Sequence, residues 1–314
     1  MSGFIYHFSL ASPLFLLVLL GYALARSGRW PETVSEALGR FAYAVAMPAM
    51  LFRMMSDFSR MPAVDVRLLL AFFGGCLIVF VIGRLVAHSL FRLDGVAQSV
   101  FALGGVFSNN VMLGVAIART TLGDSALPAV SMVIVFNALI LWTLVTVSVE
   151  WARHGEFSAR GFGKTARGVL TNPIVASILA GTLWGFANTP LPAFIDVPLA
   201  MLGQGAVPFS LVALGMGLAA YRIREGLGQS VAICTIKLGV QPLVVWLLAR
   251  ALGLPPLETQ VVTLLASLAM GINVYMMAQQ FRSLQGPVAA GMVLSTLLSS
   301  VTTPLVLALT AGAY

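Results

Sequence analysis

The sequence has few charged residues. Only 9% of its 314 residues are Asp, Glu, Lys or Arg, while 59% are hydrophobic. A soluble domain carries about 25% charged residues. With so few polar groups, a soluble fold could not cover its apolar surface, so the composition predicts a polytopic membrane protein with lipid as its main solvent.

Cysteine, histidine and buried carboxylates are also scarce. The two cysteines, Cys76 and Cys234, lie inside apolar segments, and the three histidines are scattered. This pattern excludes a disulfide framework, and we expect no metal site and no cofactor. All eleven acidic residues fall at segment ends or in loops. A site that needs a carboxylate to hold Na⁺ within the membrane is therefore disfavoured.

What the sequence does contain is an internal repeat. Matching Pro, Gly and Asn residues recur about 160 positions apart, and the pairs are Pro13/Pro173, Gly21/Gly181, Pro48/Pro208, Pro128/Pro287 and Asn110/Asn273. Each half holds five apolar segments, and because five is odd the second half enters the membrane from the opposite side. We predict a first repeat at 1–149, a linker at 150–167 and an inverted second repeat at 168–314.

The predicted fold is an all-α membrane protein with ten transmembrane helices in a 5+5 inverted repeat. Each segment is long enough to cross a bilayer, which takes roughly 20 helical residues. The expected helices are 4–25, 33–55, 66–88, 96–118, 126–149, 168–188, 195–220, 229–252, 257–280 and 287–311.

The distribution of Lys and Arg predicts the orientation. One set of loops holds eleven of them, and these are Arg26, Arg29, Arg84, Arg92, Arg153, Arg160, Lys164, Arg167, Arg222, Arg224 and Arg282. The opposite set holds five, namely Arg53, Arg60, Arg67, Arg119 and Arg250. The richer side is expected in the cytoplasm, which places the linker there and both termini outside. The net charge of +7 therefore orients the protein in the membrane, and no nucleic-acid partner is expected.

Two segments contain polar groups in the middle of the membrane. The fourth contains Ser108, Asn109 and Asn110 among glycines, and the ninth contains Gly271, Asn273 and Tyr275. Interrupted segments at matching places in two halves indicate a transporter's binding site. We predict that helices 4 and 9 are broken and that these residues contact substrate, with opened N–H groups attracting an anion. The alternative is that the asparagines only link helices. Asn137, in the middle of the fifth segment, is a weaker candidate.

Lys237 is the one ionisable residue near the middle of a predicted helix, and Gln241 follows one turn later. Charges inside the membrane are costly and are usually functional. One interpretation is a counter-charge or proton-linked pair beside the substrate cavity. The other is a lysine that braces a crossing helix.

At these residues the chain resembles the auxin efflux carrier family in its short bacterial form. Ser108–Gly114 is similar to that family's fourth-helix motif, and Gly271–Asn273 is similar to its ninth-helix motif. The resemblance implies that helices 4 and 9 cross as broken helices. It also implies a scaffold of helices 1, 2, 6 and 7 that can form a homodimer through helices 2 and 7. Helices 3–5 and 8–10 would then be the moving bundle.

The same resemblance implies a substrate class and a location. Family members carry organic anions, such as indole-3-acetate in plants and malonate or related carboxylates in bacteria, and Asn110 and Asn273 would contact them. The break would rest on Gly104, Gly105, Gly114 and Gly271, because neither segment contains proline. The plant carriers' long cytoplasmic loop is absent, which disfavours auxin. The protein is then expected in a bacterial inner membrane.

We therefore expect a secondary transporter of small organic anions that works by elevator-like alternating access. A cation-coupled symporter or antiporter of a related inverted-repeat fold is the nearest alternative, and the missing carboxylate counts against it. A channel would need a pore lined by repeated rings of polar groups, and the sequence shows isolated Asn pairs instead. An intramembrane enzyme would need a catalytic constellation that the sequence lacks.

Overall fold

The structure is a computed structural model that describes residues 2–57, 65–154, 171, 173–219 and 226–311. Every regular element in this part of the chain is a helix, and none is a strand. The predicted all-α class is therefore confirmed. Most of the predicted linker, from residue 155 onward, lies outside the described residues.

Each of the ten predicted segments contains helix where it is described, and several consist of more than one helix. The first half holds α1 (Ser2–Arg26), α2 (Glu32–Phe41), η1 (Ala42–Ala46), α3 (Met47–Met55), α4 (Arg67–Phe91), α5 (Gly95–Val106), η3 (Asn110–Gly114), α6 (Val115–Leu122), η4 (Asp124–Ala126) and α7 (Leu127–His154). The second half holds α9 (Pro173–Phe186), α10 (Ala193–Leu218), α11 (Leu227–Thr235), η5 (Ile236–Val240), α12 (Gln241–Ala251), α13 (Pro256–Ser267), α14 (Ile272–Gln280) and α15 (Gln285–Ala311).

Four helical stretches in the described residues are long and apolar enough to cross a membrane. They are Arg67–Phe91, Ala193–Leu218, Leu227–Ala251 and Gln285–Thr310, with mean hydropathies between 1.6 and 2.4. Many of their large apolar side chains face outward, as lipid-facing groups do. The helices support the predicted membrane location of the chain.

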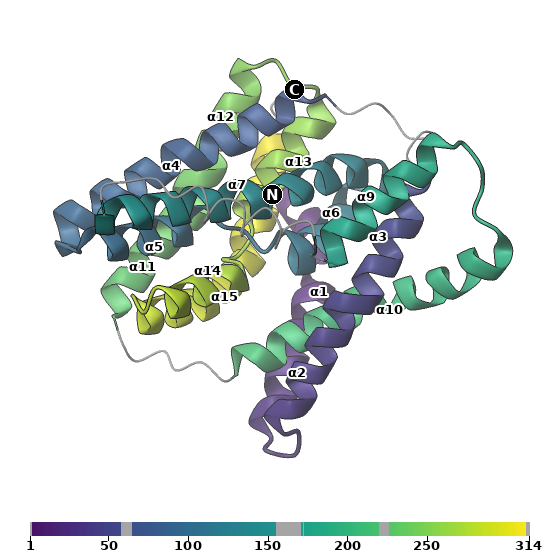
Figure 1. Ribbon diagram of the computed structural model, residues 1–314, viewed down its shortest axis with the longest axis horizontal. Coiled ribbons are helices and arrows are strands. Elements are labelled where there is room, and N and C mark those ends of the chain that lie inside the picture. The colour runs from purple at the N-terminus through teal and green to yellow at the C-terminus, as the bar shows by residue number, and fades with distance from the viewer. Residues whose placement is uncertain (1, 58–64, 155–170, 172, 220–225, 312–314) are drawn as a thin grey trace.

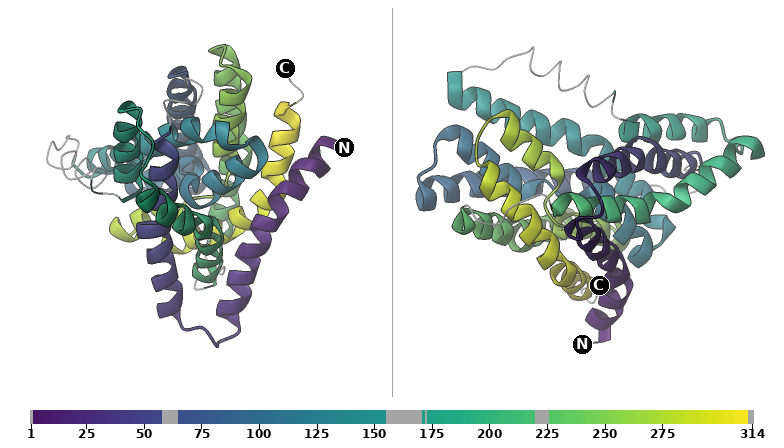
Figure 2. Two further views of the ribbon diagram at one scale, coloured as in Figure 1. Left: turned by 90° about the vertical axis from the view of Figure 1, so that its right-hand side faces the viewer. Right: turned by 90° about the horizontal axis from the view of Figure 1, so that it is seen from below.

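The helices pack in two groups (Figures 1 and 2). Helices α1, α2, α3, α9 and α10 pack mainly on one another, and α4–α7 pack with α11–α15. The long contact between α1 and α15 joins the two groups. Residues from both halves of the sequence thus contribute to each group.

Two glycines of the repeat make very close helix contacts in the first group. Gly21 of α1 faces the carbonyl oxygen of Val212 in α10 so closely that a Cβ atom would overlap it. Gly181 of α9 faces the carbonyl oxygen of Phe52 in α3, and a Cβ there would lie 2.5 Å from that oxygen. Gly181 follows Gly21 by 160 positions, and Val212 follows Phe52 by the same number. The same contact therefore occurs twice: once from a first-half glycine to the second half, and once from a second-half glycine to the first half.

Candidate functional site

The fourth and ninth segments are both broken, and the two breaks meet. Helix α5 ends at Val106 and the next helical turn begins at Asn110, while α13 ends at Ser267 and α14 begins at Ile272. Ser108 and Met270 form an antiparallel bridge between the breaks. The N–H of Asn109 donates to the carbonyl of Ala269, and the N–H of Gly271 donates to that of Phe107, both at 2.9 Å.

This pairing solves the problem of extended backbone inside a membrane protein. An unpaired N–H or C=O group in an apolar interior costs several kcal/mol, about as much as a lost hydrogen bond or more. Each break satisfies two such groups by using the other break. Two half-helices therefore start near the bridge, and their first N–H groups have no partner within their own helix.

The first break presents three polar side chains that are almost fully buried. Asn109 caps the following turn by accepting a hydrogen bond from the N–H of Met112 at 3.3 Å. Asn110 donates through Nδ2 to Oδ1 of Asn137 on α7, also at 3.3 Å. The hydroxyl of Ser108 and Oδ1 of Asn110 are buried without a hydrogen-bond partner.

The second break has a different environment. Asn273 is half-buried near the start of α14, and the described residues provide no hydrogen-bond partner for its side chain. Tyr275 lies on the same helix and is also half-buried. Helix α15 supports this break, because Ser295 Oγ accepts from the N–H of Met270 at 3.1 Å and Thr303 donates to the carbonyl of Ser267 at 3.0 Å.

Lys237 and Gln241 contact both breaks from one side. Lys237 is fully buried on η5, and its Nζ donates to the carbonyl of Ala266 at 2.7 Å. Gln241 is also fully buried, and its Nε2 donates to the carbonyl of Val106 at 2.8 Å. Pro242 explains the wide turn of η5, because a proline has no N–H for the preceding turn and its ring crowds that turn's carbonyl.

The glycines act differently from the expectation. Gly104 and Gly105 stay within α5 and do not form the break. A Cβ at Gly104 would lie 2.8 Å from Ile233, and one at Gly105 would lie 2.7 Å from Ile236. These two glycines therefore let α5 approach the eighth segment closely. Gly271 does lie at the break, where a Cβ would lie 3.0 Å from the carbonyl oxygen of Ser108.

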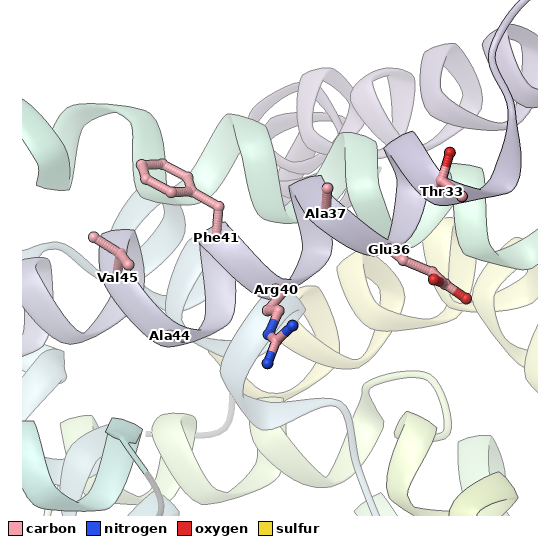
Figure 3. A pocket seen from close by; sticks show the side chains of 7 residues that line it. All are labelled: Thr33, Glu36, Ala37, Arg40, Phe41, Ala44 and Val45. Carbon is pink, nitrogen blue, oxygen red and sulfur yellow. The ribbon is translucent and has the colours of Figure 1, made fainter.

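A separate open groove lies on α2 and η1 (Figure 3). Its lining residues are Thr33, Glu36, Ala37, Arg40, Phe41, Ala44 and Val45. Neither Asn110 nor Asn273 lines it. The place where the two breaks meet, rather than this groove, brings together the candidate residues from both halves.

The comparisons with known proteins agree with this architecture. The family description "Membrane transport protein" matches residues 8–307. This chain belongs to the membrane transport protein family. The match confirms the resemblance to auxin efflux carriers that the two motifs indicated.

Two relatives of this membrane transport protein extend the comparison. A protein of Rhizobium meliloti named "Putative malonate transporter" is 28% identical over 93% of this chain and 92% of its own length. An uncharacterized transporter of Methanocaldococcus jannaschii is 23% identical over 81% of this chain and 82% of its own.

Sequence reasoning missed several residues that support the breaks. Ser295 and Thr303 are ordinary helix residues in the sequence, and their backbone partners lie 25 and 36 positions away. Hydroxyl side chains in helices usually bond to their own preceding turn, so no local signal distinguished these two. Asn137 did stand out as a polar residue in the middle of an apolar segment, and the structure brings it to Asn110.

Proposed function

We propose that this protein is a secondary transporter that moves small organic anions, carboxylates in particular, across the bacterial inner membrane. In this proposal the substrate sits where the fourth and ninth segments meet, and transport follows elevator-like alternating access. The observation that carries the proposal is the bridge at Ser108 and Met270, which gathers two helix starts and several asparagines at one buried place. Helix starts favour negative charge, and backbone N–H groups there can bind carboxylate oxygens.

The side chains at the first break can supply further donors. The buried hydroxyl of Ser108 has no partner and can donate to a carboxylate. The Asn110–Asn137 bond can also be reversed, because both amides can turn over without losing it. The Nδ2 of Asn110 then becomes free to donate to an anion. Both features suit a carboxylate better than a cation.

The named relative suggests which anion to test first. Uptake would be measured in proteoliposomes that contain the purified protein. The substrates would be malonate, other dicarboxylates and monocarboxylates, each with sodium or choline as the only external cation. We expect saturable malonate flux that exceeds the flux of empty vesicles. A panel in which no carboxylate moves, although the reconstituted protein is folded, would contradict the proposal. Flux that requires sodium would favour the cation-coupled alternative.

The proposed orientation has its own test. The bias of eleven to five in Lys and Arg predicts both termini outside and the linker in the cytoplasm. In a chain with Cys76 and Cys234 replaced by alanine, a membrane-impermeant maleimide added to intact cells should label Ser2→Cys. It should label Ser158→Cys only after the membrane is opened. The opposite labelling pattern would reverse the orientation.

We also propose that the groove on α2 and η1 binds a second copy of the chain, as the expected dimer through helices 2 and 7 requires. Glu36 and Arg40 are exposed there and lie one turn apart. Arg40 is nine residues beyond Pro31, so it lies about 13 Å along the helix. A charge at such a depth is costly when it faces lipid. In a two-fold dimer the same surface faces itself, so Glu36 of each copy can pair with Arg40 of the other.

Charge reversal tests this dimer. Glu36→Arg should lower the dimer fraction because it sets like charges against each other, and Glu36→Arg/Arg40→Glu should restore it. The dimer fraction can be measured by light scattering in detergent. Arg29→Glu, a charge reversal at an exposed residue just before the helix that does not line the groove, is the control. If the single reversal leaves the dimer fraction unchanged, the interface lies elsewhere.

A further inference from the structure

One face of η5 and α12 holds the ends of both broken helices. The carbonyls of Val106 and Ala266 belong to the last turns of α5 and α13, where they have no acceptor role within their own helices. Gln241 donates a hydrogen bond to the carbonyl of Val106, and Lys237 donates one to the carbonyl of Ala266. Among the described residues of the first repeat, the side-chain contact to Val106 is only the weak thiol of Cys76 at 3.9 Å.

The charges at this place nearly balance. The end of a helix carries about half of a negative elementary charge, so two ends together carry about one. Lys237 in its protonated form brings one positive charge; it is fully buried, and the described residues give it no ion-pair partner. Without this ammonium, the two negative ends would lie beside the helix starts that attract the substrate anion and would weaken its binding.

In transporters with broken helices, half-helix ends and unwound carbonyls commonly coordinate the coupling cation. We propose that the Lys237 ammonium takes the place of such a cation here, bound to the end of α13, while Gln241 binds the end of α5. We call these two side chains the clamp. Anion binding then needs no sodium or potassium, because the compensating charge is covalently attached. Lys237 and Gln241 are positioning residues in this account, and they do not contact the substrate. The inference rests on the proposed function, since it concerns the same anion site.

The decisive variants remove the charge and then move it. Lys237→Met keeps the length of the side chain and should weaken malonate binding by about tenfold or more, which is about 1.4 kcal/mol. Lys237→Met/Gln241→Lys returns the ammonium one turn along the same face, beside Val106, and should recover most of the affinity. Gln241→Met keeps the charge and removes one hydrogen bond, so its loss should be smaller, about threefold. Wild-type affinity for malonate should be equal in sodium chloride and choline chloride.

Hydrogen exchange gives a readout that needs no substrate. The amides of Asn109 and Gly271 bond across the bridge and should exchange slowly in the wild type. Lys237→Met should accelerate their exchange. Thr235→Val is the matched control. Thr235 is exposed at the end of α11, two residues before Lys237, and its hydroxyl donates to the carbonyl of Val231 in its own helix. Both readouts should stay at wild-type values in this control.

Three results would overturn the proposal. One is wild-type malonate affinity that depends on sodium. Another is unchanged affinity in Lys237→Met. The third is a relocated lysine that preserves slow exchange at the bridge but restores no affinity. If the wild type binds no carboxylate at all, the proposed function fails instead, and the exchange experiment still shows whether the clamp holds the two breaks together.

Discussion

Replacing Asn110 or Asn273 by alanine should weaken anion binding well beyond tenfold, which corresponds to about 1.4 kcal/mol. Each asparagine lies at the start of a half-helix next to the Ser108–Met270 bridge. Losing a side-chain donor to a charged ligand in a buried site costs about 1.5–3 kcal/mol. Equilibrium binding of malonate to the purified variants, measured by calorimetry, would give the change directly.

The two variants should differ in stability even if they lose similar affinity. Asn110 is buried and bonded to Asn137, so Asn110→Ala leaves one buried amide without its partner. Asn273 is half-buried and has no such bond in the described residues, so Asn273→Ala should melt near the wild-type temperature. Asn188→Gly is a suitable control, since Asn188 lies in a turn with φ of 54° that glycine adopts readily. Wild-type malonate affinity in both alanine variants, with folded protein, would contradict substrate contact.

Alanine at Gly21 or Gly181 should destabilise the fold strongly and to a similar extent. In both places the added Cβ would overlap a backbone carbonyl of the facing helix, of Val212 and Phe52 respectively. Backbone cannot turn aside as a flexible side chain can, so the helices must separate, at about 1–3 kcal/mol for each site. The measurement is the midpoint of thermal unfolding in detergent.

Gly217 is the matched control within the same helix group. It lies in α10, and nothing lies within 4 Å of its would-be Cβ. Gly217→Ala should therefore keep or raise the melting temperature, because alanine favours helix over glycine by up to about 1 kcal/mol. Gly215, two residues earlier, faces the carbonyl of Val18 and should behave like Gly21. Melting of Gly21→Ala and Gly181→Ala at the wild-type temperature would show that these helices can yield without cost.

The sequence by itself determined the class of this protein. Low charge and long apolar segments leave only helices that satisfy their own backbone groups in lipid, so the all-α class followed from composition. The repeat and the two Asn-containing motifs also pointed to the family. These features are local or periodic, and a single sequence displays them directly.

The tertiary structure alone decided where the fourth segment breaks and what holds the break. The glycines before it remained helical, since their small size lets α5 pack against Ile233 and Ile236, and the chain opened only after Val106. The partner of Lys237 lies 29 positions away, and that of Gln241 lies 135 positions away. The sequence showed that these polar groups needed partners. Only the packing of both halves placed the ends of two half-helices within their reach.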